Sequence, residues 1–86
     1  MRDRDLLTFE NHKAMKIRFT NHAQISMSER GISTTRVIDA IRKPDSRRPT
    51  GGGTMTCVRA FGVQKLEIIY REYKKAEYVI ITAYYL

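Results

Sequence analysis

The chain has 86 residues, a formal net charge of +7 at pH 7 and a sequence pI of about 9.9. This length suits one small domain and excludes a second within it, and no apolar run approaches the roughly 20 residues that cross a bilayer. The single cysteine, Cys57, excludes an internal disulfide and has no cysteine or histidine neighbours at zinc-site spacing, which favours a reducing compartment. We therefore expect a cytoplasmic protein that binds no metal or other cofactor.

Residues 1–14 show no clean hydrophobic period and their charges cancel, which is typical of a weakly ordered extension. The folded domain is then expected to cover residues 15–86, and it carries the whole positive excess. A compact basic domain attracts polyanions, among which nucleic acid is the commonest large one. An acidic protein partner would satisfy the same charge.

Apolar and basic side chains alternate over residues 15–19, which predicts a short amphipathic strand that leads into a helix. Asn21 is a good N-cap for this helix, and Gly31 followed by an apolar residue is typical of a left-handed C-terminal stop. His22 on the first turn and Arg30 on the last lie about 80° apart around the axis, so both can line one cleft. The plainer interpretation is a solvated histidine and an arginine that interacts with the helix dipole.

A second helix is expected to follow at once. Ser33 or Thr34 can cap it, Val37 and Ile41 belong to its apolar face, and Pro44 ends it because proline cannot continue a helix.

Residues 45–53 are expected to form a flexible loop, because they combine polar residues, a proline and three consecutive glycines. Arg42, Lys43, Arg47 and Arg48 fall within seven residues at this point, which makes it the densest positive patch of the chain. We consider these four side chains candidates for binding a nucleic-acid backbone, while an ordinary long turn explains the same composition equally well. The glycines are not a phosphate-binding motif, since its lysine and its following helix are both missing.

Three strand-like runs follow, at residues 54–61, 65–72 and 77–85. The short connections between them imply antiparallel neighbours. We therefore expect an α+β fold, with two N-terminal helices packed on one face of a curled antiparallel sheet of about four strands.

The alternation in the last run divides its side chains between two faces of the sheet. The set that we expect the helices to bury is Val79, Ile81, Ala83 and Tyr85. The open face would then carry Thr82 and Tyr84 from this run, with Arg59 from the first run, as a working surface. Both sets contain apolar residues, so the alternation alone does not decide which face is buried.

Motifs of several enzyme classes are absent from the chain. It has no dinucleotide fingerprint, no metal-binding constellation, no paired carboxylates and no serine nucleophile motif. Oxidoreductase and metallohydrolase functions are therefore weak interpretations.

Four segments resemble a known family. These are Phe-Thr-Asn-His-Ala at residues 19–23, Ser-Glu-Arg-Gly-Ile-Ser at residues 28–33, the helix that ends at Pro44, and Ile-Thr-Ala-Tyr at residues 81–84. The chain from residue 15 onward resembles the domain family DUF4258, which is grouped with the RelE/ParE-like toxins of bacterial and archaeal toxin-antitoxin modules. This resemblance implies two helices on a four-stranded antiparallel sheet, with an active site on its open face.

The resemblance also implies a reaction and its residues. A metal-independent endoribonuclease lets the ribose 2'-hydroxyl attack the adjacent phosphate. In this chain His22 would be the acid/base, Arg30 and Arg59 would stabilise charge on the phosphoryl oxygens, and Thr82 or Tyr84 would bind a phosphate or stack a base. The partners implied are RNA and an acidic antitoxin protein that folds onto the basic surface.

Two other functions remain open. A basic nucleic-acid-binding module without catalysis would use His22 structurally and would grip phosphates with the patch from Arg42 to Arg48. A ParE-type toxin would act on a protein target, and its basic surface would only receive the acidic antitoxin.

Overall fold

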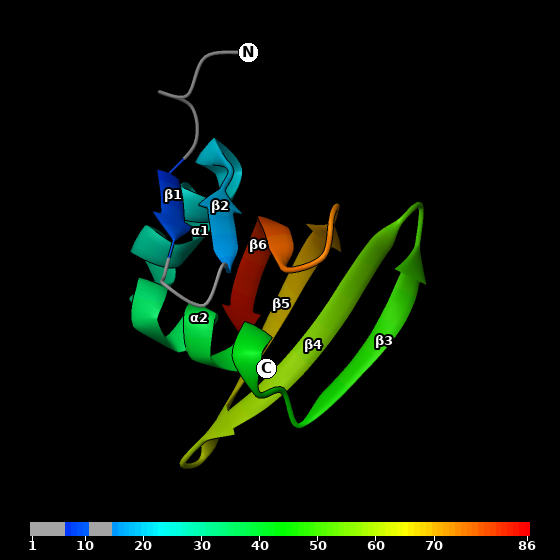
Figure 1. Ribbon diagram of the computed structural model, residues 1–86. Helices are drawn as coiled ribbons and strands as arrows, with labels where there is room; N and C mark the ends of the chain where they lie inside the picture. The colour runs from blue at the N-terminus through cyan, green and yellow to red at the C-terminus, as the bar shows by residue number, and fades with distance from the viewer. Residues whose placement is uncertain (1–6, 11–14) are drawn as a thin grey trace.

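The computed structural model describes residues 7–10 and 15–86, which form six strands and two helices (Figure 1). In chain order these are β1 (Leu7–Glu10), β2 (Lys16–Phe19), α1 (Asn21–Arg30), α2 (Thr34–Arg42), β3 (Ser46–Gly51), β4 (Thr54–Phe61), β5 (Gln64–Glu72) and β6 (Glu77–Tyr85). β1 lies inside the expected N-terminal extension, and the rest of that extension falls outside the described residues.

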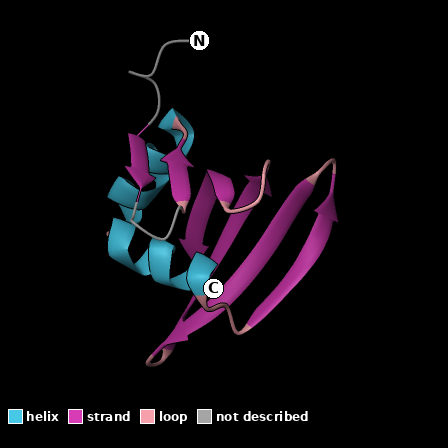
Figure 2. Cartoon of the chain, viewed as in Figure 1, coloured by secondary structure: helices cyan, strands magenta, loops and turns pink. Residues whose placement is uncertain are grey.

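The six described strands form one mixed sheet in the order β1-β2-β6-β5-β4-β3. β2 runs parallel to β6, and every other neighbouring pair is antiparallel. The α+β class and the two helices are confirmed. The prediction of about four antiparallel strands is wrong, since it did not include β1 and β3 and it missed the parallel pair. α1 packs against β6 and β2, whereas α2 packs against β5 and β4 (Figure 2).

The residues at the ends of the helices each have a clear physical role. Thr20, rather than Asn21, is the N-cap of α1, and its side chain accepts a hydrogen bond from the Ala23 N–H. Gly31 ends α1 with a φ of 66°, a left-handed conformation that glycine adopts without strain, as the sequence predicted. Ser33 caps α2 through the Arg36 N–H.

A bulge in β6 changes which side chains face the helices. Tyr70 lies opposite Ile80 and Ile69 lies opposite Thr82, so Ile81 is an extra residue on β6. Ile80 and Ala83 are therefore both fully buried, although they are three positions apart and strict alternation would place them on opposite faces. The predicted alternation is right after the bulge and wrong before it, where Ile80 rather than its odd-numbered neighbours is buried.

The core lies between the helices and one face of the sheet. Ala23 and Met27 enter it from α1, and Val37 from α2, against Ile68 and Tyr70 of β5. Cys57 is fully buried in this core, where its Sγ lies 3.8 Å from the Ala40 carbonyl oxygen of α2. We call the other face, to which Thr82 and Tyr84 point, the open face.

The segment expected to be a loop is largely a strand. β3 pairs with β4 as an antiparallel hairpin, whose turn at Gly51–Gly53 lies away from both helices (Figure 1). All six residues of β3 are exposed, and as an edge strand it tolerates Pro49, which has no N–H to donate. The loop prediction is wrong because pairing with β4 outweighs the polar composition of this segment.

Candidate functional site

Three side chains of α1 at four-residue spacing meet at Ser26. His22 is exposed, and its Nε2 lies 3.5 Å from the Oγ of the buried Ser26. The Arg30 Nη1 donates a hydrogen bond to the Ser26 carbonyl oxygen at 3.3 Å. The sequence prediction that His22 and Arg30 can share one cleft is therefore consistent with their common neighbour.

Ser26 connects this helix stripe to the sheet. The Thr82 hydroxyl donates a hydrogen bond to the Ser26 Oγ at 3.4 Å. β2 pairs with β6 only as far as Ile80, so the next residues of β6 have no strand on that side and α1 packs against them. Thr20 fixes this junction, because its N–H and its hydroxyl both donate to the Ile80 carbonyl oxygen, at 3.2 and 3.0 Å.

A second polar pair lies beside Thr82 on the open face. Tyr84 is two residues further along β6, about 7 Å away, and it lies opposite Glu67 of β5. The Tyr84 hydroxyl donates a short hydrogen bond to the Glu67 Oε2. This hydrogen bond and burial raise the pKa of Tyr84, while the positive charge of Arg48 lowers it. The phenol therefore keeps its proton at neutral pH.

We call the five residues gathered here the α1–β6 site. They are His22, Arg30, Glu67, Thr82 and Tyr84.

Cations surround this site on the open face. Arg48 lies in the same cross-strand row as Thr82, three strands away. Arg71 reaches over the β3–β4 turn to the Gly52 carbonyl oxygen. Arg18 forms the one ion pair among the described side chains, with Glu77 at 3.9 Å.

Arg59 does not belong to the α1–β6 site. Arg59 lies two residues after the buried Cys57 on β4. The two side chains therefore share a face of the sheet, and Arg59 points to the helices rather than to the open face. Its Nη1 donates a hydrogen bond to the Asp39 carbonyl oxygen of α2 at 3.0 Å, and its guanidinium lies 5.0 Å from the centre of the Phe61 ring. The expectation that Arg59 shares a surface with Thr82 and Tyr84 is wrong.

The four cations expected to form one nucleic-acid patch are divided between two faces. Arg42 and Lys43 line a hollow of about 200 Å³ at the end of α2. Arg47 and Arg48 point to opposite faces because they are neighbours on a strand, and burial raises the pKa of Tyr70 while the nearby Arg47 lowers it.

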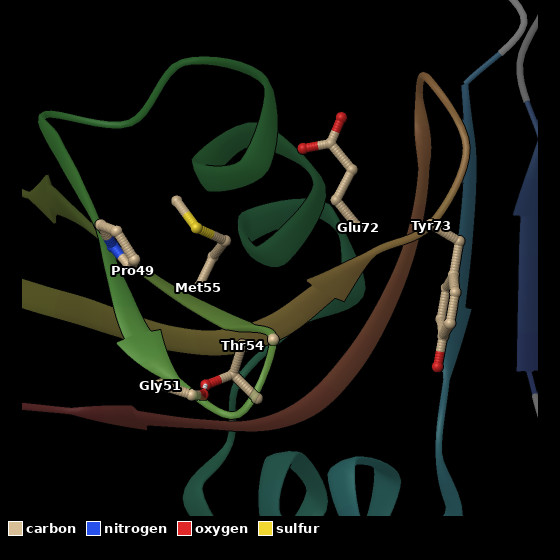
Figure 3. Close-up of a pocket in the computed structure, with 7 residues that line it drawn as sticks. Pro49, Gly51, Thr54, Met55, Glu72 and Tyr73 are labelled. Carbon is tan, nitrogen blue, oxygen red and sulfur yellow. Dashed lines mark hydrogen bonds between the residues drawn. The ribbon is translucent and has the colours of Figure 1, made fainter.

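Another hollow, of about 420 Å³, lies where the β3–β4 turn approaches the end of β5. Figure 3 shows Pro49 and Met55 on neighbouring strands, with Tyr73 at the far side. Glu72 is the only carboxylate in its lining and no cation lines it, so it lacks the groups that bind a phosphate.

The sequence analysis did not identify two residues here: Glu67, which belongs to the α1–β6 site, and Ser26, which contacts it. Ser26 had a signal, since it follows His22 by four residues and thus shares its helix face. Glu67 had none, because its position opposite Tyr84 depends on the register between β5 and β6, which the bulge shifts.

Among the described residues, no group of three or more histidine, cysteine, aspartate or glutamate side chains is arranged to hold a metal ion. Neither described helix has the length and apolar character that a membrane crossing requires. Comparison with curated proteins and with solved structures found no match to this chain. Residues 19–85 match the family described as a domain of unknown function (DUF4258), so the chain belongs to this family.

Proposed function

We propose that the protein is a toxin-like endoribonuclease that cleaves RNA at the α1–β6 site without a metal ion. The observation that carries this proposal is the chain of polar contacts from the exposed His22 through Ser26 to Thr82, next to the Tyr84–Glu67 pair. It brings an imidazole, a group that can accept or donate a proton, to the edge of a face that carries several cations.

Attack by a ribose 2'-hydroxyl needs a proton acceptor, a proton donor for the leaving 5'-oxygen, and positive charge at the phosphoryl oxygens. The Oε1 of Glu67 has no hydrogen bond within the described residues and serves as the acceptor. His22 serves as the donor from the other side of Thr82. The products are a cyclic phosphate end and a 5'-hydroxyl end.

Arg30 provides the positive charge in this proposal. Among the described residues only its Nη1 is engaged, with the Ser26 carbonyl oxygen, so its remaining N–H groups can donate to two phosphoryl oxygens at once. The Thr82 hydroxyl exchanges its contact with Ser26 for one with the phosphate, and the Tyr84 ring stacks on a base beside it. Arg59 has no part in the reaction because it faces α2.

An acidic antitoxin protein would be the natural partner of such a toxin. The net charge of +7 and the cations of the open face support this part of the proposal. A partly disordered acidic segment that folds onto the open face would cover the α1–β6 site and block RNA.

The test is incubation of the purified protein with single-stranded RNA in EDTA, and with ribosome-bound messenger RNA in the Mg²⁺ that intact ribosomes require. We expect cleavage with cyclic phosphate ends, and a loss of rate of about 10²–10⁴-fold in His22→Ala. Lys74→Ala is the matched surface control, since Lys74 is exposed and lies in the β5–β6 turn. Intact RNA in both arms, or equal rates for wild type and His22→Ala, would overturn the proposal.

A nucleic-acid-binding module without catalysis is the second candidate. The observation that favours it is that the contacts of Ser26 with His22 and Thr82 also fasten α1 to β6, which is a purely structural role. Such a module would bind RNA with an affinity that falls steeply with salt and would release no product.

A further inference from the structure

Four cations, from the two ends of α2 and from the end of β4, lie on the helix-packed side. We call them the α2 basic cluster: Arg36, Arg42, Lys43 and Arg59. Arg42 and Lys43 are exposed, and with Arg59 and Asp39 they line the hollow of about 200 Å³.

Arg59 is held in place before any ligand arrives. Its Nη1 donates to the Asp39 carbonyl oxygen at 3.0 Å, and its guanidinium lies 5.0 Å from the centre of the Phe61 ring. The guanidinium of Arg36 lies 4.8 Å from the centre of the same ring. A charged group that is fixed in advance binds a ligand without further loss of side-chain entropy.

The charge of the cluster is not neutralised within the protein. The partners of Arg36 are the neutral Gln64 Oε1 and the Tyr85 hydroxyl, at 3.1 and 2.7 Å. No cation of the cluster forms an ion pair with a described carboxylate. Asp39 is the one carboxylate in the lining of the hollow, against three cations. Like charges held close together repel one another, and an anion between them removes that repulsion.

We propose that this hollow binds a phosphate group. Arginine presents a planar fork of N–H donors that matches two phosphate oxygens, and lysine adds a compact positive charge. The lining polar groups are donors except for Asp39, so the anionic oxygens of a phosphate group fit them better than an uncharged sugar.

The hollow is separate from the α1–β6 site and does not depend on the proposed function. Arg59 and the buried Cys57 share one face of β4, whereas Thr82 and Tyr84 point to the other face of the sheet. The phosphate belongs either to a nucleic-acid strand that passes the end of α2 or to a free phosphate ion, and one experiment separates these sources.

The experiment follows the side-chain Nε–Hε signals of arginine by NMR in isotope-labelled protein. One arm adds inorganic phosphate and the other adds a short oligodeoxythymidylate, which has phosphates but no 2'-hydroxyl and so is not cleaved. The variant is the double substitution Arg42→Ala and Lys43→Ala, in which both side chains are exposed. The control, Lys74→Ala with Lys75→Ala, removes two exposed cations from the β5–β6 turn.

We expect the Arg59 signal to shift on binding, and the double variant to lose about tenfold in affinity, which is roughly 1.4 kcal/mol. If the oligonucleotide binds here, the slope of log affinity against log salt becomes shallower by about 0.7 in the variant, the value for one lost phosphate contact on a single strand. A shift with inorganic phosphate assigns the site to free phosphate, and a shift with the oligonucleotide alone assigns it to nucleic acid.

The proposal is overturned if neither ligand shifts the Arg59 signal, or if the control loses as much affinity as the double variant. Binding at this hollow by a protein that leaves RNA intact would refute the proposed function alone.

Discussion

Thr20 is the residue that both starts α1 and fixes the bulge of β6, and its removal gives a sharp test of the structure. Its Oγ1 accepts from the Ala23 N–H at 3.1 Å and donates to the Ile80 carbonyl oxygen at 3.0 Å. The substitution Thr20→Ala removes both hydrogen bonds and leaves the backbone hydrogen bond from the Thr20 N–H in place.

The cost follows from these two contacts. Loss of an N-cap costs about 1 kcal/mol. Loss of a part-buried hydrogen bond costs about another 1 kcal/mol. We therefore expect Thr20→Ala to lower the free energy of unfolding by about 2 kcal/mol, which in a domain of this size lowers Tm by about 8–16 °C. Thr20→Ser keeps the hydroxyl, and we expect it to retain most of the stability.

Urea unfolding followed by circular dichroism measures this free energy, with Asn21→Ala as the matched control. Asn21 is the cap that the sequence favours, yet it is exposed and its side chain makes no hydrogen bond with the described residues. We expect Asn21→Ala to cost less than about 0.5 kcal/mol. An equal or larger cost for Asn21→Ala than for Thr20→Ala would refute the assignment of the cap and of the bulge contact.

Two further predictions concern ionisable groups. Burial raises the pKa of the Cys57 thiol to about 11, so at about pH 8 the folded protein holds roughly two hundredfold less thiolate than an ordinary cysteine. A thiol reagent should therefore react rapidly only after unfolding in urea, and rapid reaction of the folded protein would contradict the buried position. The Tyr84 pKa is raised, first by its hydrogen bond to Glu67, so the stability from this contact is complete below pH 10.0 and is lost as the pH rises through the folded pKa. Phenolate absorbance should show a lower Tyr84 midpoint in Glu67→Ala, and an unchanged or higher midpoint would contradict the pairing.

Local chemistry predicted the parts of the fold that depend on neighbouring residues. Gly31 at the end of α1 and Ser33 at the start of α2 are confirmed, because each satisfies backbone groups within a few residues. Asn21 was wrong as a cap because the choice between it and Thr20 depends on the Ile80 carbonyl oxygen, 60 residues away in sequence.

The antiparallel pairing of β4, β5 and β6 was predicted from their short connections, whereas the pairing of β3 and the register of β6 were not. The sequence of β3 is typical of a loop because this strand buries no side chains of its own. It is stabilised by its pairing with β4. The bulge at Ile81 reverses which side chains of β6 face the helices, and no residue type in this strand indicates a bulge. Arg59 was also predicted on the wrong face of the sheet. It lies two residues from the buried Cys57, and this spacing indicates that both side chains face the helices.

The parallel pairing of β2 with β6 also determines the order in which the molecule is assembled. The hairpins formed by β3 to β6 close short loops, whereas the pairing of Thr20 with Ile80 spans 60 residues and carries a larger entropic cost of closure. We therefore expect the meander to form first and the N-terminal segment to dock on it as a late step. His22 and Thr82 lie on opposite sides of that junction, so the α1–β6 site comes into existence only when the final docking is complete.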